Sequence, residues 1–385
     1  MKMSLSNIAK RTFLLALAVL LAQDVSRAIA AEDTWLGQTV FIKETAKPKL
    51  GNKVIPWNEV GMPATITKVD GDWLWVGKAW VRTGEVVRRD DAPIYYATVL
   101  KRDPSAAYAY MLRGVAWRLK RDYENALRDF TEAIRLEPDA HIAYQARAAV
   151  YHQMQEYEKA LADISEAIRL APNVGLYYSD RGCIYKSLGN YPKAREQFDE
   201  AVRINPKLAL AFANRGVNWF IEKQYDKAMA DCDKALSIDN KLTFAYNQRG
   251  YVWSKQGHYA QALKDWDESI RIAPFEPGGY HNKARLYATC MSLGHRDGQM
   301  ALENARKACE LDHWEEWRYV ACLAAAYAEL GKFDEAIEWQ NKAIAMNKHP
   351  ERRDTVEQQE RLKLYEAGMP FRDPEISEDE SDSSG

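Results

Sequence analysis

Between Ala107 and Pro274 the apolar and polar positions of the chain repeat every 34 residues, five times in succession. In each period an aromatic, a small and a second aromatic residue are spaced i, i+4 and i+7, which puts them on one face of a helix. An alanine, a residue that is usually bulky and a second small residue follow with the same spacing and indicate a second amphipathic helix. Proline, which cannot continue a helix, closes four of the five periods. The sequence therefore predicts five consecutive helix–turn–helix units.

The marker residues align without gaps. In the first helix they are Tyr110, Gly114 and Trp117; Tyr144, Ala148 and Tyr151; Tyr178, Gly182 and Tyr185; Phe212, Gly216 and Trp219; Tyr246, Gly250 and Trp253. In the second they are Ala126, Phe130 and Ala133; Ala160, Ile164 and Ala167; Ala194, Phe198 and Ala201; Ala228, Cys232 and Ala235; Ala262, Trp266 and Ser269. This pattern resembles the tetratricopeptide repeat. The resemblance implies a mainly α fold, an α-solenoid of helix pairs that forms a right-handed superhelix with a concave inner wall.

Residues 31–92 have a different pattern and are predicted to form a small β domain. Short runs rich in β-branched and aromatic residues are separated by Gly, Asp and Pro, and the turn Asp70–Asp72 indicates a hairpin. This segment resembles a small SH3-like β-barrel of the bacterial kind. Its tryptophans either line a groove for a peptide or glycan or fill the small core, and the second interpretation is at least as strong for two of them, Trp75 and Trp80. The set is Trp35, Trp57, Trp73, Trp75 and Trp80.

The remaining segments extend or flank the five periods. Residues 93–104 resemble the second helix of a truncated repeat and are expected to cap the N-terminal end of the solenoid. A sixth unit has a longer loop at 292–298, and a seventh follows, so the solenoid is predicted to span residues 105–346. Residues 347–373 are predicted to hold a charged C-terminal capping helix, and 374–385 to be an acidic disordered tail.

Residues 1–30 have the pattern of a secretory signal peptide. A basic start is followed by an apolar run, Thr12–Ala22, that is too short to span a bilayer comfortably, and then by the small residues Ala28 and Ala30 around a cleavage position. An uncleaved signal anchor is the alternative. The mature chain is therefore expected to be exported, to the periplasm or outside the cell.

Charge and cysteine content narrow the function classes. The formal net charge is −2, residues 1–30 contribute +3, and the mature part is thus near −5, which argues against a general nucleic-acid binder. The five cysteines are far apart and are expected to be free thiols, with a Cys309–Cys322 bridge as the alternative.

No catalytic motif, phosphate loop or metal-ligand spacing is present among the histidines, cysteines and carboxylates, so no enzymatic activity, cofactor or metal is predicted. One series of charged residues instead repeats with the 34-residue period. Arg113, Arg147, Arg181, Arg215, Arg249 and Lys283 recur in the first helices, and Asp129, Asp163, Asp231 and Asp265 in the second helices. We interpret them as ion pairs that join the helices within units or between neighbouring units.

A partner-binding groove is predicted from the family resemblance, because positions 2, 5, 9 and 12 of the first helix commonly face the inner wall of such solenoids. The candidate groove residues are Tyr108, Met111, Arg118, Gln145, His152, Ser179, Lys186, Leu210, Phe220, Phe244, Asn247, Tyr251 and Ser254. Their mixed chemistry suits an extended peptide or a partner helix. Packing between repeats is an equally open interpretation for the apolar ones. The Lys/Asn set with which some family members bind a C-terminal carboxylate is not reproduced.

Three functions follow. The first is a non-enzymatic protein–protein interaction scaffold of the cell envelope or periplasm. The second is a cell-wall or glycan-associated factor, targeted by the SH3-like domain, that recruits an envelope enzyme. The third is an enzyme with an unrecognised site in the β domain or in the loop after Ser292.

Overall fold

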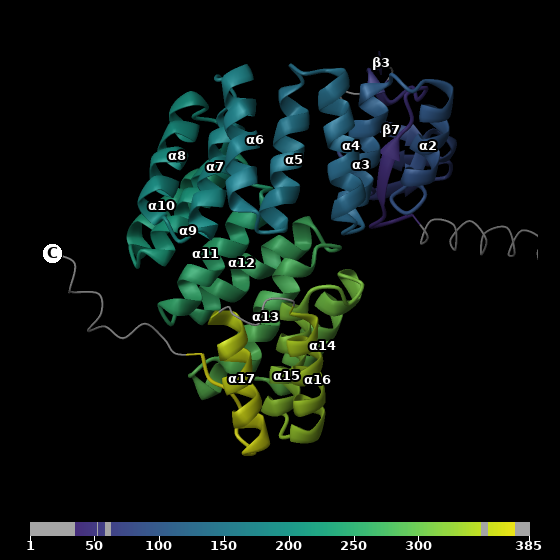
Figure 1. The fold of residues 1–385 in the computed structure, drawn as a ribbon. Coiled ribbons are helices and arrows are strands. Elements are labelled where there is room, and N and C mark those ends of the chain that lie inside the picture. The colour runs from purple at the N-terminus through teal and green to yellow at the C-terminus, as the bar shows by residue number, and fades with distance from the viewer. Residues whose placement is uncertain (1–34, 52, 58–62, 348–352, 374–385) are drawn as a thin grey trace, which may run out of the picture. The chain divides into compact units, whose positions relative to one another are not determined.

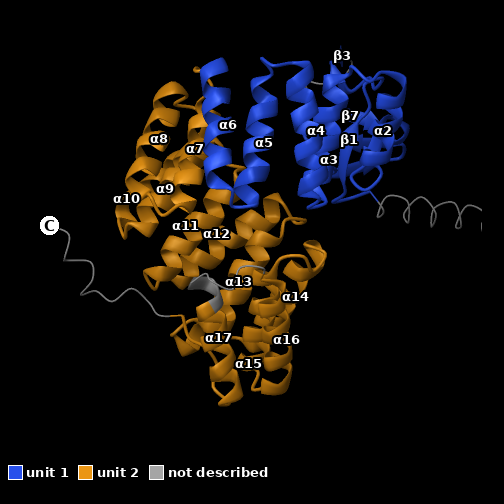
Figure 2. Ribbon diagram, in the orientation of Figure 1, with its two compact units in different colours: residues 1–170 blue, residues 171–385 orange. Residues whose placement is uncertain are grey.

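The computed structural model describes residues 35–51, 53–57, 63–347 and 353–373 (Figure 1). The predicted signal peptide and acidic tail lie outside these residues. The chain divides into two compact units, residues 1–170 and 171–385 (Figure 2). The described residues contain sixteen α-helices and eight short strands, so the chain is mainly α, as predicted.

The N-terminal part of unit 1 consists of two small antiparallel sheets, ordered β4-β1-β8 and β3-β2-β7-β6-β5. The strands are β1 (Thr39–Ile42), β2 (Lys49–Leu50), β3 (Lys53–Val54), β4 (Ala64–Thr65), β5 (Lys68–Asp70), β6 (Trp73–Trp75), β7 (Trp80–Arg82) and β8 (Val86–Arg88), with a 3-10 turn, η2 (Thr83–Glu85), before the last. The predicted hairpin is confirmed: β5 pairs with β6, Asp70 stands opposite Trp73, and Gly71 in the turn has φ +53°. The likeness to an SH3 barrel remains a prediction.

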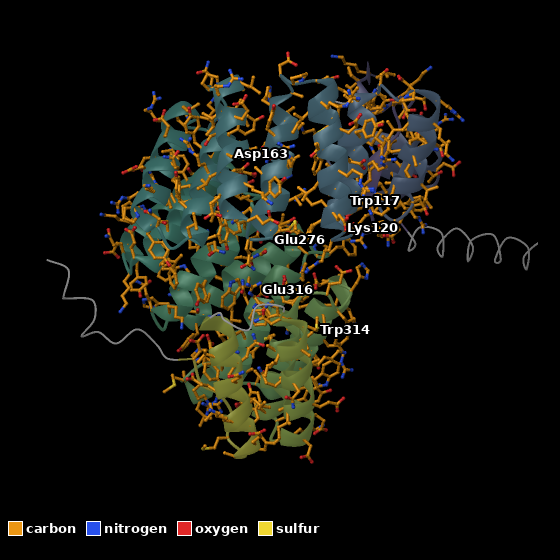
Figure 3. The ribbon with its side chains drawn as sticks, viewed as in Figure 1. Trp117, Lys120, Asp163, Glu276, Trp314 and Glu316 are labelled. Atoms are coloured by element: carbon orange, nitrogen blue, oxygen red, sulfur yellow. The ribbon has the colours of Figure 1, made fainter. Side chains whose placement is uncertain are left out.

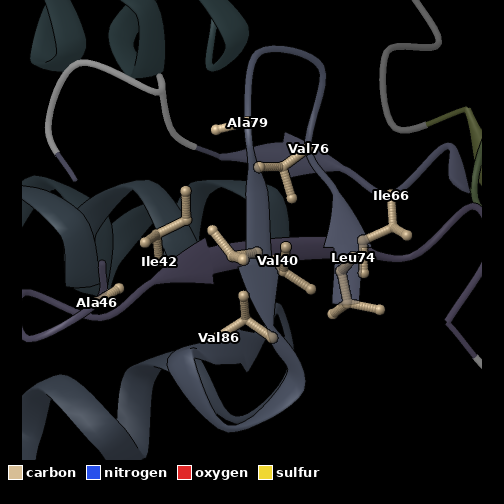
Figure 4. Close-up of a cluster of buried hydrophobic side chains, with 9 residues drawn as sticks. Val40, Ile42, Ala46, Ile66, Leu74, Val76, Ala79 and Val86 are labelled. Carbon is tan, nitrogen blue, oxygen red and sulfur yellow. The ribbon is translucent and has the colours of Figure 1, made fainter. Parts of the chain in front are cut away.

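The buried core of these sheets is aliphatic, and Trp35 and Trp57 are partly buried against it. Val40, Ile42, Ile66, Leu74 and Val81 are fully buried (Figure 4). Strand alternation turns the neighbouring tryptophans away from the deepest positions, because successive side chains point to opposite faces. The interpretation of Trp75 and Trp80 as core residues is therefore wrong. Both are half-buried, and their rings pack across β6 and β7 at 5.4 Å.

The sheets and the first repeat share a second core. Phe41 of β1 packs edge-on against Tyr96 of α2 (Ala92–Arg102), with ring centroids 6.1 Å apart, and the cluster continues to Ala109 of α3. The hydroxyl of Tyr95 donates to Glu44 at 2.9 Å. Helix α2 occupies the segment in which a capping helix was predicted, and through this core it connects the sheets to the repeats of unit 1.

The helices of the five periods begin 34 residues apart, as predicted. In unit 1 they are α3 (Ala107–Leu119), α4 (Tyr123–Leu136), α5 (His141–Gln153) and α6 (Tyr157–Leu170). In unit 2 they are α7 (Gly175–Ser187), α8 (Tyr191–Ile204), α9 (Ala209–Ile221), α10 (Tyr225–Ile238), α11 (Thr243–Lys255) and α12 (Tyr259–Ile272). The turn inside each pair also has one left-handed residue at the same place, and two of the five are glycine: Arg121, Gln155, Gly189, Lys223 and Gly257.

Unit 2 continues with two further helix pairs and a final helix. These are α13 (Pro277–Thr289) and α14 (Gly298–Leu311), separated by the predicted longer loop with its 3-10 turn η3 (Leu293–His295), then α15 (Trp317–Glu329), α16 (Phe333–Met346) and α17 (Arg353–Glu366). Helix α17 follows the seventh pair and packs on α16. Although it is highly charged, its Tyr365 is fully buried against Ala324, Ala328 and Ala336.

The small residue of the first helix allows the close contact within a pair. A β-carbon on Gly182 would lie 2.6 Å from the ring of Phe198, and one on Gly114 would lie 2.7 Å from the ring of Phe130. In the second period, where Ala148 replaces glycine, the facing residue is Ile164 instead of an aromatic residue. In these three pairs the two positions compensate each other in volume, whereas in the fourth period Gly216 faces the smaller Cys232.

Candidate functional site

The recurring arginines and aspartates form ion pairs within the helix pairs, as predicted. The guanidinium of Arg113 donates to both oxygens of Asp129, at 2.8 and 2.6 Å. The same two-bond pairing joins Arg147 to Asp163, Arg215 to Asp231 and Arg249 to Asp265, at 2.7–2.9 Å. In the third period Gln197 stands at the aspartate place and accepts from Arg181 at 2.7 Å. All four aspartates are buried, so the pairs are structural.

A second bond joins neighbouring repeats within each unit. Arg215 donates to Asp199 of the preceding helix pair at 2.7 Å, and Arg249 donates to Asp233 at 2.6 Å. Lys283 makes only this second kind of contact, to Asp267 at 2.5 Å. The acceptors Asp199, Asp233 and Asp267 lie 34 residues apart in successive second helices, and Thr131 occupies the same place in unit 1. This second series was not predicted. Both alternatives, pairing within and between repeats, are thus present.

These contacts also fix the charge of the arginines. The hydrogen bond to Asp231 raises the pKa of Arg215, and the bond to Asp265 does the same for Arg249. Burial raises the pKa of Asp129, although its bonds to Arg113 oppose that shift. The guanidinium of Arg113 lies 5.4 Å from the ring centroid of Tyr110, and the same cation–π contact recurs in the next four repeats.

The first helices of consecutive repeats contact one another in unit 2, from α7 through α9, α11 and α13 to α15. This row forms the inner wall of the unit. Leu210, Phe220, Phe244, Asn247, Tyr251, Ser254 and Lys186 are half-buried on these helices. The rings of Phe220 and Tyr251 pack at 4.8 Å across α9 and α11. The prediction that Ser179 lines the groove is wrong. Its side chain is fully buried, and its hydroxyl accepts a hydrogen bond from Asn214 of α9 at 3.1 Å, because position 5 of α7 faces α9 and not the inner wall.

In unit 1 the candidate groove residues lie on α3 and α5. Tyr108 is 39% exposed, and its ring packs 6.1 Å from Trp57, which brings a residue of the β domain next to the first repeat. The ring of His152 packs against Tyr157 at 5.9 Å. Met111, Arg118 and Gln145 are half-buried on the same helices. Packing between neighbouring elements therefore already uses part of this surface.

The first of two cavities on the inner wall of unit 2 lies between α11 and α13. Tyr251, Ser254, Lys255, Asn282 and Arg285 are among its lining residues, and its volume is about 30 Å³. Asp373 also lines it, because the chain turns back after α17 and brings Arg372 and Asp373 to the end of α13, where Asp373 also reaches Lys255 of α11. Two predicted groove residues, Tyr251 and Ser254, are thus brought to a cavity together with residues that were not predicted.

The second cavity, of about 210 Å³, lies between α13, α15 and α17. Its cations are Arg285, Arg318 and Arg361. Arg361 is paired with Glu357 at 2.5 Å and Arg318 with Glu316 at 2.9 Å; Figure 3 labels Glu316, which lies directly before α15. The amide of Gln358 lines the cavity, is 2% exposed and has no hydrogen-bond partner on either atom. Water in the cavity or a polar ligand would satisfy that amide.

The sequence contained a signal for this second cavity. His281 and Arg285 occupy positions 5 and 9 of α13, Arg318 and Ala321 occupy positions 2 and 5 of α15, and Arg361 occupies position 9 of α17. Extending the groove register beyond the fifth period would have found all of them. Asp373 had no such signal, because it lies outside any helix.

Acid is expected to destabilise unit 2 through His281. Burial, and then the nearby Arg285, Arg318 and Arg361, lower its pKa from 6.5 to about 3, and its Nδ1 is buried without a partner. Between pH 6.5 and 3 only the unfolded chain takes up this proton, so stability is complete above pH 6.5 and falls as the pH decreases. We expect a loss of about 1–2 kcal/mol at pH 5.

Urea unfolding at pH 7.5 and pH 5 measures this loss. His281→Phe keeps a ring against Tyr319, 5.0 Å away, and should reduce the difference between the two pH values. His258→Phe, at an exposed turn position, is the control and should leave the difference unchanged. An equal pH dependence in all three chains would contradict the assignment to His281.

The five cysteines are free, and the Cys309–Cys322 bridge is not formed. Burial raises the pKa of the Cys232, Cys309 and Cys322 thiols to about 12 and of Cys183 to about 11. They therefore serve packing and lack the thiolate character of a nucleophile. Within the described residues, no three His, Cys, Asp or Glu side chains are grouped to hold a metal, and no helix has the length and apolarity needed to cross a membrane.

Comparison with known families decides the nature of the helix pairs. Models of the tetratricopeptide repeat match residues 107–140, 141–174, 175–208 and 323–350. These are tetratricopeptide repeats. The family-model matches thus reach the seventh helix pair, and unit 2 contains repeats on both sides of the longer loop. Such repeats support a role as a protein–protein interaction scaffold.

Solved structures show the same fold at low sequence identity. The yeast Tom70 structure has a TM-score of 0.53 and 18% identity, and the alignment covers 73% of this chain and 58% of that one. A chain of the APC/C hetero-tetramer Cut9–Hcn1 has a TM-score of 0.50 and 17% identity, with 62% and 46% covered. The chain thus matches about half the length of these two structures. A search of curated proteins gave no match.

Proposed function

We propose that the protein is an exported scaffold of the cell envelope or periplasm that binds an extended peptide of a partner along the first helices of its tetratricopeptide repeats. The observation that supports this most strongly is the extended segment Phe371–Asp373, which lies against α11, α13 and α15 in unit 2. A wall that accommodates one extended peptide through ion pairs and main-chain bonds suits others of similar chemistry. Export is supported by the pattern of residues 1–30.

Affinity capture from the envelope of the source cells tests this function. The mature full chain is compared with Phe220→Ala, which removes a ring from the inner wall, and with Arg271→Ala, which breaks an exposed pair to Glu268. We expect the captured partner to decrease about tenfold with Phe220→Ala and to be unchanged with Arg271→Ala. Thermal melting of each variant shows that it is folded. Capture that is equal with all three chains, or no capture, would count against a partner in the groove.

A second candidate function rests on the outer face of the five-stranded sheet. Trp73, Trp75 and Trp80 are half-buried there, and Lys49 and Arg82 lie 5.0 and 5.2 Å from the ring of Trp73. Aromatic rings next to cations suit a glycan or another cell-wall polymer. The prediction is that the full chain sediments with purified cell wall and that Trp75→Ala together with Trp80→Ala reduces the bound fraction several-fold. Unchanged sedimentation would rule this surface out.

A further inference from the structure

We propose that residues Phe371–Asp373 are an intramolecular ligand of the unit 2 groove, and that the partner is an extended peptide that displaces them by placing its own acidic side chain between Lys255 and Arg285. This inference rests on the proposed function, because it specifies the chemistry of the peptide. The groove residues and the segment all belong to unit 2.

The carboxylate of Asp373 is held by two cations from two different first helices. Its Oδ1 contacts Nζ of Lys255 at the end of α11, and its Oδ2 lies 3.0 Å from Nη2 of Arg285 in α13. The three side chains are only 17–28% exposed. Burial alone would raise the pKa of Asp373, but the two cations outweigh burial and lower the pKa below its usual value. The site therefore selects an ionised carboxylate.

Main-chain contacts hold Asp373 against the end of α13. The N–H of Asp373 donates to the carbonyl of Thr289 at 2.8 Å, and Asp373 forms a parallel bridge with Cys290 just after α13. Main-chain bonds of this kind recognise an extended peptide without regard to its side chains. The α13 helix end supplies them because the longer loop of the sixth repeat begins there.

The two preceding residues are also recognised by their chemistry. Arg372 is paired with Glu329 at 2.6 Å and donates to the carbonyl of Ala288 at 3.1 Å. The guanidinium of Arg361 lies 4.1 Å from the ring centroid of Phe371. The groove thus binds a basic and an acidic residue in succession, whereas Phe371 also packs on the apolar cluster of α15, α16 and α17 around Tyr365. We infer that the partner peptide has an acidic residue at the third place, preceded by a basic one.

The segment competes with any partner because it is tethered. Six residues separate Asp373 from the end of α17 at Glu366, and a short tether raises the local concentration of a ligand to roughly the millimolar range. The unmodified chain should therefore bind a peptide in trans weakly. Its apparent dissociation constant should equal the intrinsic constant divided by the fraction of chains whose groove is open.

Fluorescence anisotropy with a labelled synthetic peptide of residues 367–377 tests this. The full chain is compared with the full chain carrying Arg372→Ala and Asp373→Ala, which frees the groove. We expect the second chain to bind the peptide at least tenfold more tightly. A peptide carrying Asp373→Asn should bind the doubly substituted chain at least tenfold more weakly than the unmodified peptide does. Adding Lys255→Glu to the doubly substituted chain should abolish its binding of the peptide. Adding Lys264→Glu, at an exposed position on α12, should leave the binding unchanged.

Hydrogen exchange of the full chain provides a readout that does not depend on the freed chain. Asp373→Asn should increase amide exchange in residues 369–373 about tenfold and leave that of α15 unchanged. Equal peptide binding by both chains, no binding by either, or binding insensitive to Asp373→Asn would show that the segment is a permanent structural strap. Capture of a partner that depends on Phe220 would then still support the proposed function, so the two failures are distinguishable.

Discussion

Arg215→Ala is expected to destabilise unit 2 by about 3–5 kcal/mol, because it leaves a buried carboxylate without its partner. Asp231 is 6% exposed, and both of its oxygens accept from Arg215 at 2.8 Å. The substitution also removes the bond to Asp199, but Asp199 is more than half exposed and that bond contributes little. Chemical unfolding of the full chain, followed by circular dichroism, measures the shift in midpoint.

Arg181→Ala is the matched control for this prediction. The same position in the third repeat donates a single bond to the neutral amide of Gln197, so its removal should cost only about 1 kcal/mol. A double substitution, Arg215→Leu with Asp231→Leu, should recover most of the loss, since no unpaired charge remains. An unchanged midpoint for Arg215→Ala, or equal losses for Arg215→Ala and Arg181→Ala, would show that the ion pairs do not hold the repeats.

The repeat architecture could be predicted from the sequence because every helix pair makes the same packing contacts and therefore has the same residue types at the same positions. The glycine at Gly114, the ring at Phe130 and the charge at Arg113 each recur, and a residue present in every period reports on the contact that every period makes. The ion pairs followed from the same logic. The core of the β domain did not, because alternation places Trp75 and its neighbour Leu74 on opposite faces without saying which face is covered.

The candidate site was predicted in part. Tyr251 and Ser254 reach a cavity because they occupy groove positions of a regular repeat, and Arg285 follows from the same register one repeat later. Ser179 shares that register but is buried, since Asn214 of the next repeat takes up its hydroxyl. Asp373 could not be found from periodicity. Its place depends on how the chain turns after α17, which no repeating pattern determines.

Gly182→Ala is expected to destabilise unit 2, because overpacking costs about 1–3 kcal/mol. The higher helix propensity of alanine offsets roughly 1 kcal/mol of that cost. The added β-carbon would lie 2.6 Å from Cε1 and 2.8 Å from Cδ1 of the Phe198 ring, which is fully buried. Urea unfolding of the full chain measures the change.

The second repeat indicates how the clash is relieved. There Ala148 faces Ile164, so in the Phe198→Ile background Gly182→Ala should become neutral or stabilising, with a coupling energy of about 1 kcal/mol or more between the two sites. Gly189→Ala, at a turn glycine with φ +72° and open space around it, separates backbone strain from packing, since its cost should be the same in both backgrounds. If Gly182→Ala cost as much with isoleucine at the facing position as with phenylalanine, the glycine would be needed for the backbone alone. Coupling would instead show that the small residue and the ring of this repeat form one packing unit.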